Sequence, residues 1–302
     1  MVIDTHVHVL RQGELSGETL IAEMDAADID KAFMITYTAQ DIRPQFDAQG
    51  TPIEEVAPVY SKEHALETWR AHRDRLFWFT DSVDPDRPGY LDDLKADLDS
   101  GAVGVKLLPV FVGMLPDNPG FRPVYELCRE RDLPIILDPS YWYLGMYPLH
   151  KTPQEQRNIR DYAQYAALMS PIFDEFSEVR FCVAHYGTPN LLVSGALDFG
   201  LLDPVIEMVK RPPNVCVDLA AMPVPSQEEF PQPTPVALLQ RLIAGVGAEK
   251  VMFGTDYPYF GRPAHVWRNL WRLIDEALPS LSREERDLIL YRNALRFVGA
   301  AG

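Results

Sequence analysis

The chain has 302 residues, of which 47% are hydrophobic and 24% charged, proportions that are ordinary for a globular protein with a large core. Acidic residues outnumber Lys and Arg by 44 to 28, and the formal net charge of −16 argues against binding to nucleic acids or anionic membranes. The three cysteines are widely spaced and predict neither a disulfide framework nor a zinc ribbon. No signal peptide or membrane span is visible at the N-terminus, so we expect a cytoplasmic protein.

Short apolar runs recur along the chain, each rich in Val, Ile, Leu or Phe and with little polar alternation. Continuous apolar strands are typical of a parallel sheet that is covered on both faces. The predicted strands are, in chain order, Val2–His8, Lys31–Thr36, Leu76–Thr80, Val103–Leu107, Pro134–Asp138, Val179–His185, Asn214–Leu219 and Lys250–Asp256.

Helical patterns separate these strands. They cover Glu18–Ala27, Ser61–Arg73, Gly89–Leu98, Phe121–Arg131, Ile159–Phe176, Leu202–Lys210, Pro235–Ala244, His265–Ala277 and Ser282–Val298. Ser282 and Glu285 have the spacing of a capping box at the start of the last helix. Eight strands alternating with helices predict a (β/α)₈ barrel that forms one domain over residues 1–302. A doubly wound open sheet is the alternative, although such sheets more often have about five to seven strands.

Three connections are long, and each follows the carboxyl end of a predicted strand. They are Ala39–Tyr60, Pro139–Asn158 and Ala220–Pro235, and many of the 26 prolines fall within them. In a barrel this end of the strands carries the active site, so we expect these segments to form ordered lids over it.

Ionisable residues end several of the predicted strands. The first run ends in His6-Val7-His8, and strand alternation places both imidazoles on one face with Asp4 behind them. The other such residues are Lys106, Asp138, His185 and Asp256. In a closed barrel all of them would meet at one mouth. Neutral imidazoles and carboxylates are good ligands for a divalent transition metal, which lowers the pKa of a bound water.

Each of these signals is ambiguous when it is taken alone. Paired histidines on a strand are more often hydrogen-bonded to neighbours than bound to a metal, and a single Asp or His at a strand end is more often a cap. Lys106 is more often a salt-bridge partner than a catalytic lysine. The whole set in strand order is a stronger indication than its parts.

Five segments carry a resemblance to a known family. They are IDTHVHV, GVKLLP, FCVAHYG, VMFGTDYP and the C-terminal ILYRNALRFVG. In this order they resemble the amidohydrolase-related group of the amidohydrolase superfamily. The group includes aminocarboxymuconate-semialdehyde decarboxylase, γ-resorcylate decarboxylase and pyrone-dicarboxylate lactonase, and the resemblance covers nearly the whole chain.

The resemblance implies roles for particular residues. His6 and His8 match the paired metal ligands of the first strand. Asp256 matches an aspartate that ligates the metal, takes a proton, or does both, and His185 matches a histidine that acts as an acid or base near the metal. In binuclear relatives a carboxylated lysine bridges two metals, but this group uses one metal or none, so Lys106 is interpreted as a contact to a substrate carboxylate or oxyanion.

Asp138 departs from the pattern of the group, whose metal-dependent members carry a histidine ligand on the fifth strand. Asp138 could complete a ligand set of two histidines and two aspartates, which would weaken the Lewis acidity of the ion and favour Mn²⁺ over Zn²⁺. The site could instead be free of metal, as is thought for the lactonases of the group. The third interpretation is that Asp138 only hydrogen-bonds a neighbour, with His185 or water completing a zinc shell.

Residues of the long loops are candidates for substrate contacts. The loop after Asp138 carries four aromatic residues, among them Tyr141 and Trp142, which suit a planar substrate or a lid packed on itself. Arg43 and Arg262 could bind a carboxylate through two hydrogen bonds each, or could simply be exposed. No phosphate-binding loop or dinucleotide fingerprint is present, so we expect no nucleotide cofactor.

The sequence therefore predicts a metal-dependent hydrolase, with Zn or Mn as the ion, in which water attacks a lactone, ester or amide carbonyl. The alternatives are a lyase that decarboxylates an aromatic or unsaturated acid, a metal-free lactonase, and a degenerate barrel that binds without catalysis. The expected partner is a small molecule such as a planar carboxylate, with no nucleic acid or membrane. Barrels of the group are often dimers or larger, so a homo-oligomer is compatible with the resemblance.

Overall fold

Eight parallel strands form the centre of the protein. The strands are β1 (Ile3–Val7), β2 (Lys31–Ile35), β3 (Leu76–Thr80), β4 (Gly104–Leu107), β5 (Ile135–Leu137), β6 (Phe181–Val183), β9 (Val215–Asp218) and β10 (Val251–Met252), hydrogen-bonded in that order. The computed structural model describes residues 1–9, 16–37, 61–139, 141, 154, 158–187, 192–193, 196–197, 199–222, 230–231, 233–258, 264–276 and 278–300. Every predicted strand is confirmed, and its ends differ from the prediction by at most four residues.

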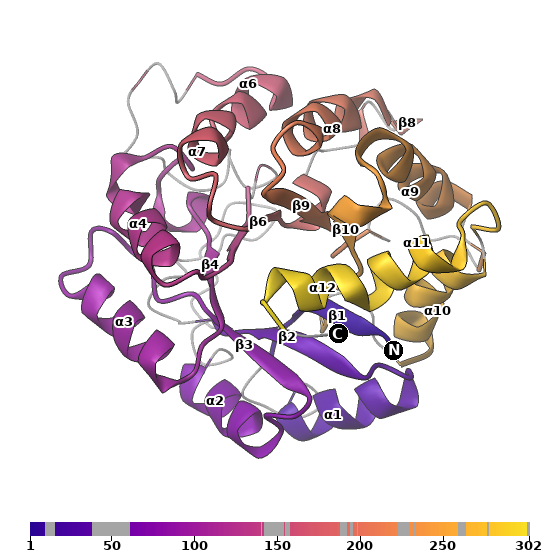
Figure 1. Cartoon of the computed structure of the whole chain (residues 1–302), viewed down its shortest axis with the longest axis horizontal. Helices are drawn as coiled ribbons and strands as arrows, with labels where there is room; N and C mark the ends of the chain where they lie inside the picture. Colours follow the sequence, from indigo (N-terminus) through magenta and orange to yellow (C-terminus); the bar gives the residue numbers. More distant parts are fainter. Residues whose placement is uncertain are drawn as a thin grey trace.

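Backbone hydrogen bonds close the sheet into a ring between β1 and the segment after β10. The N–H of His8 donates to the carbonyl of Tyr257 at 2.7 Å, and the N–H of Asp256 donates to the carbonyl of His6 at 2.9 Å. Figure 1 shows the strands at the centre with helices outside them. The predicted (β/α)₈ barrel is confirmed, and the open-sheet alternative is wrong.

Helices surround the barrel and match the predicted helical patterns. They are α1 (Gly17–Ala26), α2 (Lys62–Ala71), α3 (Tyr90–Ser100), α4 (Arg122–Glu130), α6 (Tyr162–Ala167), α7 (Ser170–Glu175), α8 (Asp203–Lys210), α9 (Pro233–Val246), α10 (Ala264–Asp275), α11 (Arg283–Asp287) and α12 (Asn293–Phe297). The capping box is confirmed, because Ser282 Oγ accepts the N–H of Glu285 at 3.2 Å while the Glu285 carboxylate accepts the N–H of Ser282 at 2.8 Å. In the part of the chain that the structure describes, no helix has the length and apolar character needed to cross a membrane.

Two details differ from the sequence prediction. The single helix expected over 159–176 is two helices, since Pro171 lies in the first turn of α7, where its missing N–H does no harm but where it cannot continue α6. A short antiparallel hairpin, β7 (Leu192–Val193) with β8 (Ala196–Leu197), was not predicted because two-residue strands leave no periodic pattern.

Apolar side chains fill the barrel interior at its amino-terminal end. The interior cluster contains Ile3, Phe33, Ile35, Phe79, Ile136, Cys182, Ala184 and Met252, together with Ala294, Leu295 and Phe297 from the C-terminal helix. Helix α12 therefore closes the amino-terminal mouth, where Figure 1 shows it lying across the strands. The opposite mouth, at the carboxyl ends of the strands, is the one that can carry polar side chains for chemistry.

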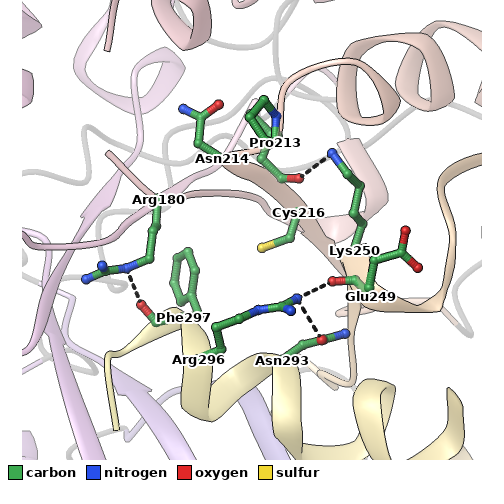
Figure 2. Close-up of a pocket in the computed structure, with 10 residues that line it drawn as sticks. Arg180, Pro213, Asn214, Cys216, Glu249, Lys250, Asn293, Arg296 and Phe297 are labelled. Atoms are coloured by element: carbon green, nitrogen blue, oxygen red, sulfur yellow. Dashed lines mark hydrogen bonds between the residues drawn. The ribbon is translucent and has the colours of Figure 1, made fainter. Parts of the chain in front are cut away.

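A hollow of about 420 Å³ lies beside this closing helix, between the starts of β6, β9 and β10. Its basic side chains donate to backbone carbonyls. Arg180 Nε donates to the carbonyl of Phe297 at 2.9 Å (Figure 2), and Lys250 Nζ donates to the carbonyl of Val209 at 2.7 Å. These contacts join strand ends to the closing helix and to α8. The hollow thus lies at the end of the barrel opposite the ionisable cluster.

Strand β1 contains an irregularity that changes which side chains face inward. Asp4 aligns with Ala32 of β2, whereas Val7 aligns with Met34, so β1 has one extra residue over this stretch. Strict alternation would place Asp4 on the same side of β1 as His6 and His8. Because of the extra residue, Ile3 faces the interior cluster instead.

The expectation that Asp4 lies directly behind the histidines needs a correction for this reason. Asp4 Oδ1 accepts the backbone N–H groups of His6 at 2.9 Å and Thr255 at 3.1 Å, and Oδ2 accepts the Thr255 hydroxyl at 2.5 Å. Asp4 thus ties β1 to the chain after β10. Burial raises the pKa of this carboxyl to about 7.

Candidate active site

The ionisable side chains that end the strands meet at the carboxyl-end mouth of the barrel. Each is at least nine-tenths buried, with exposed fractions from 0 to 9%. The cluster consists of His6, His8, Lys106, Asp138, His185, Asp218 and Asp256. Charged groups this deeply buried require partners, so their pairing decides what the site can do.

Three of these residues bring potential metal ligands together. His8 Nε2 lies 3.3 Å from Asp256 Oδ1, and His6 Nε2 lies 3.9 Å from the same oxygen. The three residues form a group whose ligand atoms all lie within 4.8 Å of one another. The H-x-H pair and the aspartate after β10 are therefore adjacent in space, although about 250 residues separate them.

The opposite ring nitrogens of both histidines have fixed partners. His8 Nδ1 lies 3.1 Å from the carbonyl oxygen of Ile35, which can only accept, so Nδ1 carries the proton and Nε2 the lone pair. His6 Nδ1 lies 3.0 Å from Asp218 Oδ2. Burial lowers the pKa of both rings, helped at His6 by the charge of Lys106 and opposed at His8 by Asp256. Both imidazoles are thus held neutral, the form that binds metals.

The backbone is unusual where the site residues leave the strands. His185, Tyr186 and Asp256 have φ angles of 54°, 43° and 66°, in the left-handed region that residues with side chains seldom adopt. Each such conformation costs about 1 to 2 kcal/mol. These turns redirect the chain as it leaves β6 and β10, at the points where the side chains enter the cluster.

Asp138 forms an acid–base group with its neighbours. Its Oδ2 lies 3.2 Å from His185 Nε2 and 3.4 Å from Lys106 Nζ. Burial alone would raise the pKa of Asp138, but Lys106 and His185 outweigh it and hold that pKa well below its usual range. Burial alone would lower the pKa of His185, but Asp138 and Asp256 outweigh it and raise that pKa. The result is an ionised carboxylate beside a histidine that retains its proton more readily than usual.

The predicted metal-ligand role of Asp138 stays a prediction. Within the described ranges, the groups with metal-binding spacing are His6–His8–Asp256 and His6–His185–Asp218, and neither contains Asp138. Its contacts with Lys106 and His185 correspond to the interpretation that it hydrogen-bonds a neighbour. The salt-bridge interpretation of Lys106 likewise matches the structure.

Asp218 belongs to the cluster but was not among the predicted site residues. It is fully buried at the end of β9, and its Oδ1 accepts the backbone N–H of His185 at 2.7 Å. The signal was present in the sequence, because Asp218 follows the apolar residues VCV of the seventh run as Asp138 follows IIL of the fifth.

The proposed substrate contacts are described only in part. Tyr141 is partly buried, and its ring packs against Tyr162 at 5.1 Å and Tyr165 at 5.4 Å, on helix α6. Trp142, Arg43 and Arg262 lie outside the described residues, as do most of the three long loops. The substrate-binding roles of these four residues stay predictions.

Comparison with known proteins places the chain in a family. Residues 3–300 match the family model described as amidohydrolase. The chain belongs to the amidohydrolase family. A search of curated proteins found no match.

Solved structures show the same barrel. A zinc-bound amidohydrolase from Burkholderia multivorans is similar over 100% of both chains, with 13% identity and a TM-score of 0.69. A probable 2-pyrone-4,6-dicarboxylic acid hydrolase from Acinetobacter baumannii matches over 99% of both chains, with 14% identity and a TM-score of 0.64. A 5-carboxyvanillate decarboxylase from Sphingomonas paucimobilis also covers 99% of both chains, at 18% identity and a TM-score of 0.61. At these identities the likeness shows the fold.

The donor set of this amidohydrolase suits a divalent ion. His6 and His8 are neutral, and at His8 the lone pair lies on Nε2, the nitrogen nearer to Asp256. Burial alone would raise the pKa of Asp256, but the charge of His185 outweighs it, so the carboxyl is ionised. These three residues together form a candidate site for a divalent metal.

Proposed function

We propose that the protein is a hydrolase that uses a divalent ion, held by His6, His8 and Asp256, in the attack of water on a lactone, ester or amide carbonyl. The observation that carries this proposal is the approach of His6 Nε2 and His8 Nε2 to one oxygen of Asp256, at 3.9 and 3.3 Å. An ion at these atoms supplies Lewis acidity, which lowers the pKa of water and polarises a carbonyl oxygen.

The residues around the ion then move the protons. Asp256 is ionised and accepts the proton that water loses as it adds to the carbonyl carbon. His185 has a raised pKa and donates its proton to the leaving oxygen or nitrogen as that bond breaks. The products are a carboxylic acid and an alcohol or amine, so atoms and protons balance.

The orientation of His185 supports its role as the proton donor. Its Nε2 is engaged with Asp138, whereas its Nδ1 is buried and has no hydrogen-bond partner among the residues described here. A buried N–H without a partner is costly, and a substrate oxygen or nitrogen would satisfy it. Asp138 holds the ring in this orientation and stabilises its charged form.

The substrate we propose is a small planar molecule that carries a carboxylate. Lys106 is fully buried with its ammonium group beside His6 and Asp138, and it supplies positive charge next to the reacting centre. The fold is shared with a probable 2-pyrone-4,6-dicarboxylic acid hydrolase and a 5-carboxyvanillate decarboxylase, and both names describe substrates with carboxylates on a ring. Tyr141, Trp142, Arg43 and Arg262 remain the candidates for holding the ring and its carboxylate.

Metal content and turnover test the proposal. We expect about one equivalent of zinc or manganese in the purified protein by mass spectrometry. The ion should be lost in His6→Ala and retained in Asp138→Ala if Asp138 is not a ligand. Asp256→Asn should lower kcat at least ~100-fold on any lactone or ester that the wild-type protein hydrolyses, because it removes both a ligand and the base.

Two results would overturn this assignment. A near-normal rate in a folded Asp256→Asn variant would exclude the mechanism. Absence of turnover over a broad panel of lactones, esters and amides, with no metal bound after incubation with zinc and manganese, would favour a barrel that binds without catalysis.

Decarboxylation is the second candidate, and the raised pKa of His185 favours it. In that reaction the bond between the ring carbon and the carboxylate breaks, CO₂ leaves, and His185 protonates the carbon that keeps the electron pair. Reaction in ¹⁸O-labelled water separates the two chemistries. Hydrolysis places one labelled oxygen in the organic product, whereas decarboxylation releases CO₂ and places none.

A further inference from the structure

We propose that Asp218 is a positioning residue that fixes the ring tautomer of His6, so that Nε2 presents its lone pair on the side of Asp256. This inference deepens the proposed function and rests on it only for the use of that lone pair in metal binding. Asp218 lies on β9 and His6 on β1, and the contact between them crosses the carboxyl-end mouth of the barrel.

The two nitrogens of His6 have partners of opposite kind. Nδ1 lies 3.0 Å from Asp218 Oδ2, and Nε2 lies 3.1 Å from Lys106 Nζ. A neutral imidazole has one ring proton, a carboxylate only accepts, and an ammonium only donates. Both contacts therefore require the proton on Nδ1 and the lone pair on Nε2.

Asp218 is itself held rigidly by four donors. Its Oδ1 accepts the backbone N–H of His185 at 2.7 Å and that of Ala220 at 3.1 Å, and Oδ2 accepts the Cys182 thiol at 3.7 Å as well as His6. These bonds use the lone pairs of both oxygens. Asp218 lies close enough to His6 and His185 to form a metal-binding group with them, but a metal would have to displace protein donors from its oxygens, which accept four, whereas at His6 Nε2 it would replace only the contact with Lys106.

The same carboxylate contacts both His185, the proposed proton donor, and His6, the proposed metal ligand. Through Oδ1 it fixes the backbone of His185, whose φ of 54° requires support, and through Oδ2 it orients the ring of His6. The two rings lie next to each other, with centroids 4.5 Å apart. Asp218 thus sets the position of the proton donor relative to the metal-binding nitrogen.

The change Asp218→Asn separates this role from simple packing. The asparagine amide has almost the same shape, and its oxygen can keep the two backbone N–H groups. Its NH₂ group then faces His6 Nδ1, which must accept, so the ring proton moves to Nε2, where it blocks the lone pair and breaks the 3.1 Å contact with the Lys106 ammonium. We expect the affinity for zinc to fall about 10- to 100-fold, the usual effect of losing a partner that orients a metal-binding histidine.

Asp4→Asn is the matched control. Asp4 is also fully buried and contacts His6, but through the backbone N–H rather than the ring. The same chemical change should leave the His6 tautomer and the zinc affinity as in the wild-type protein.

Nuclear magnetic resonance of protein labelled with ¹⁵N-histidine tests the tautomer directly. The His6 ring signals are assigned by their loss in His6→Gln. We expect a protonated Nδ1 and an unprotonated Nε2 in the wild-type protein and in Asp4→Asn, and the reverse in Asp218→Asn. Zinc affinity is then measured in each protein by competition with a chelator.

A protonated Nε2 in the wild-type protein would overturn the inference. This measurement needs no variant, so it tests the inference even where Asp218→Asn fails to fold. An unchanged tautomer or an unchanged zinc affinity in folded Asp218→Asn would also overturn it. Failure of the proposed function gives a different pattern, in which the wild-type protein binds no zinc or hydrolyses nothing while the His6 ring still carries its proton on Nδ1.

Discussion

At the level of single residues, the pairing of buried charges determines what the barrel mouth can do. Lys106 and Asp138 are almost completely buried and form an ion pair of 3.4 Å, and His185 contacts the same carboxylate oxygen at 3.2 Å. Neither charge would be tolerated alone at this depth. The ion pair therefore supports the fold, and its carboxylate, Asp138, helps to raise the pKa of His185.

Removal of one partner tests this pairing. Asp138→Asn should lower the free energy of unfolding by about 3 kcal/mol at pH 7, since it leaves Lys106 buried without a carboxylate. The folded pKa of Asp138 lies below the unfolded value of about 3.9, so the unfolded state binds more protons as the pH falls. The stabilisation is thus complete above pH 4 to 5 and is lost as the pH falls toward the folded pKa.

Urea unfolding at several pH values measures the effect. The difference between the wild-type protein and Asp138→Asn should be largest near neutral pH and should shrink by pH 3. A difference that stayed constant between pH 7 and pH 3 would show that the carboxylate charge is not the cause.

At the level of elements, close packing inside the barrel limits which residues the strands can carry. At Gly104 of β4, a Cβ atom would lie 2.4 Å from the ring of Phe79 and 2.8 Å from the carbonyl oxygen of Pro134. Phe79 belongs to the interior cluster and packs against Phe33 and Phe297. The ring thus occupies the space that the glycine leaves, two residues before Lys106.

Gly104→Ala should consequently destabilise the protein by about 1 to 3 kcal/mol through overpacking. Denaturant unfolding would show a lower midpoint with an unchanged slope. Gly104→Ala combined with Phe79→Leu should recover part of the loss, because the smaller side chain frees the space beside β4. An unchanged midpoint in Gly104→Ala would mean that the ring moves aside without cost.

At the level of the whole molecule, the two mouths of the barrel have separate tasks. The carboxyl-end mouth holds the buried ionisable cluster, whereas α12 closes the amino-terminal mouth with apolar side chains. Asn293 joins this closing helix to the barrel, since its Nδ2 donates to the carbonyls of Ala248 and Val251 at 2.8 Å each. Such a division allows stability and chemistry to be changed independently.

Asn293→Ala tests the independence of the two mouths. The substitution leaves two buried carbonyls without a donor and should cost about 2 to 3 kcal/mol of unfolding free energy. Zinc affinity, measured by chelator competition below the unfolding temperature, should be unchanged. A parallel loss of zinc affinity would show that the closing helix also controls the geometry of His6, His8 and Asp256.

Much of the barrel could be predicted because the burial of a strand is visible in the residue types of that strand. A strand covered on both faces must be apolar throughout, so each strand of the barrel appears as a short apolar run. The ionisable residues that interrupt these runs mark the ends of the strands, which made His6, His8, Lys106, Asp138, His185 and Asp256 visible as candidates. The split between α6 and α7 could also have been read from Pro171, but the long apolar pattern around it hid the break.

The sequence by itself determined the alternation of strands and helices and the residue types at the mouth, because both follow from local composition and from the period of two along a strand. Only the tertiary structure decided which of those residues are partners. His6 meets Asp218 across 212 positions of the chain, and the extra residue in β1 shifts its inward-facing set. Such contacts depend on the register between strands and on closure of the ring, which leave no pattern in neighbouring residues.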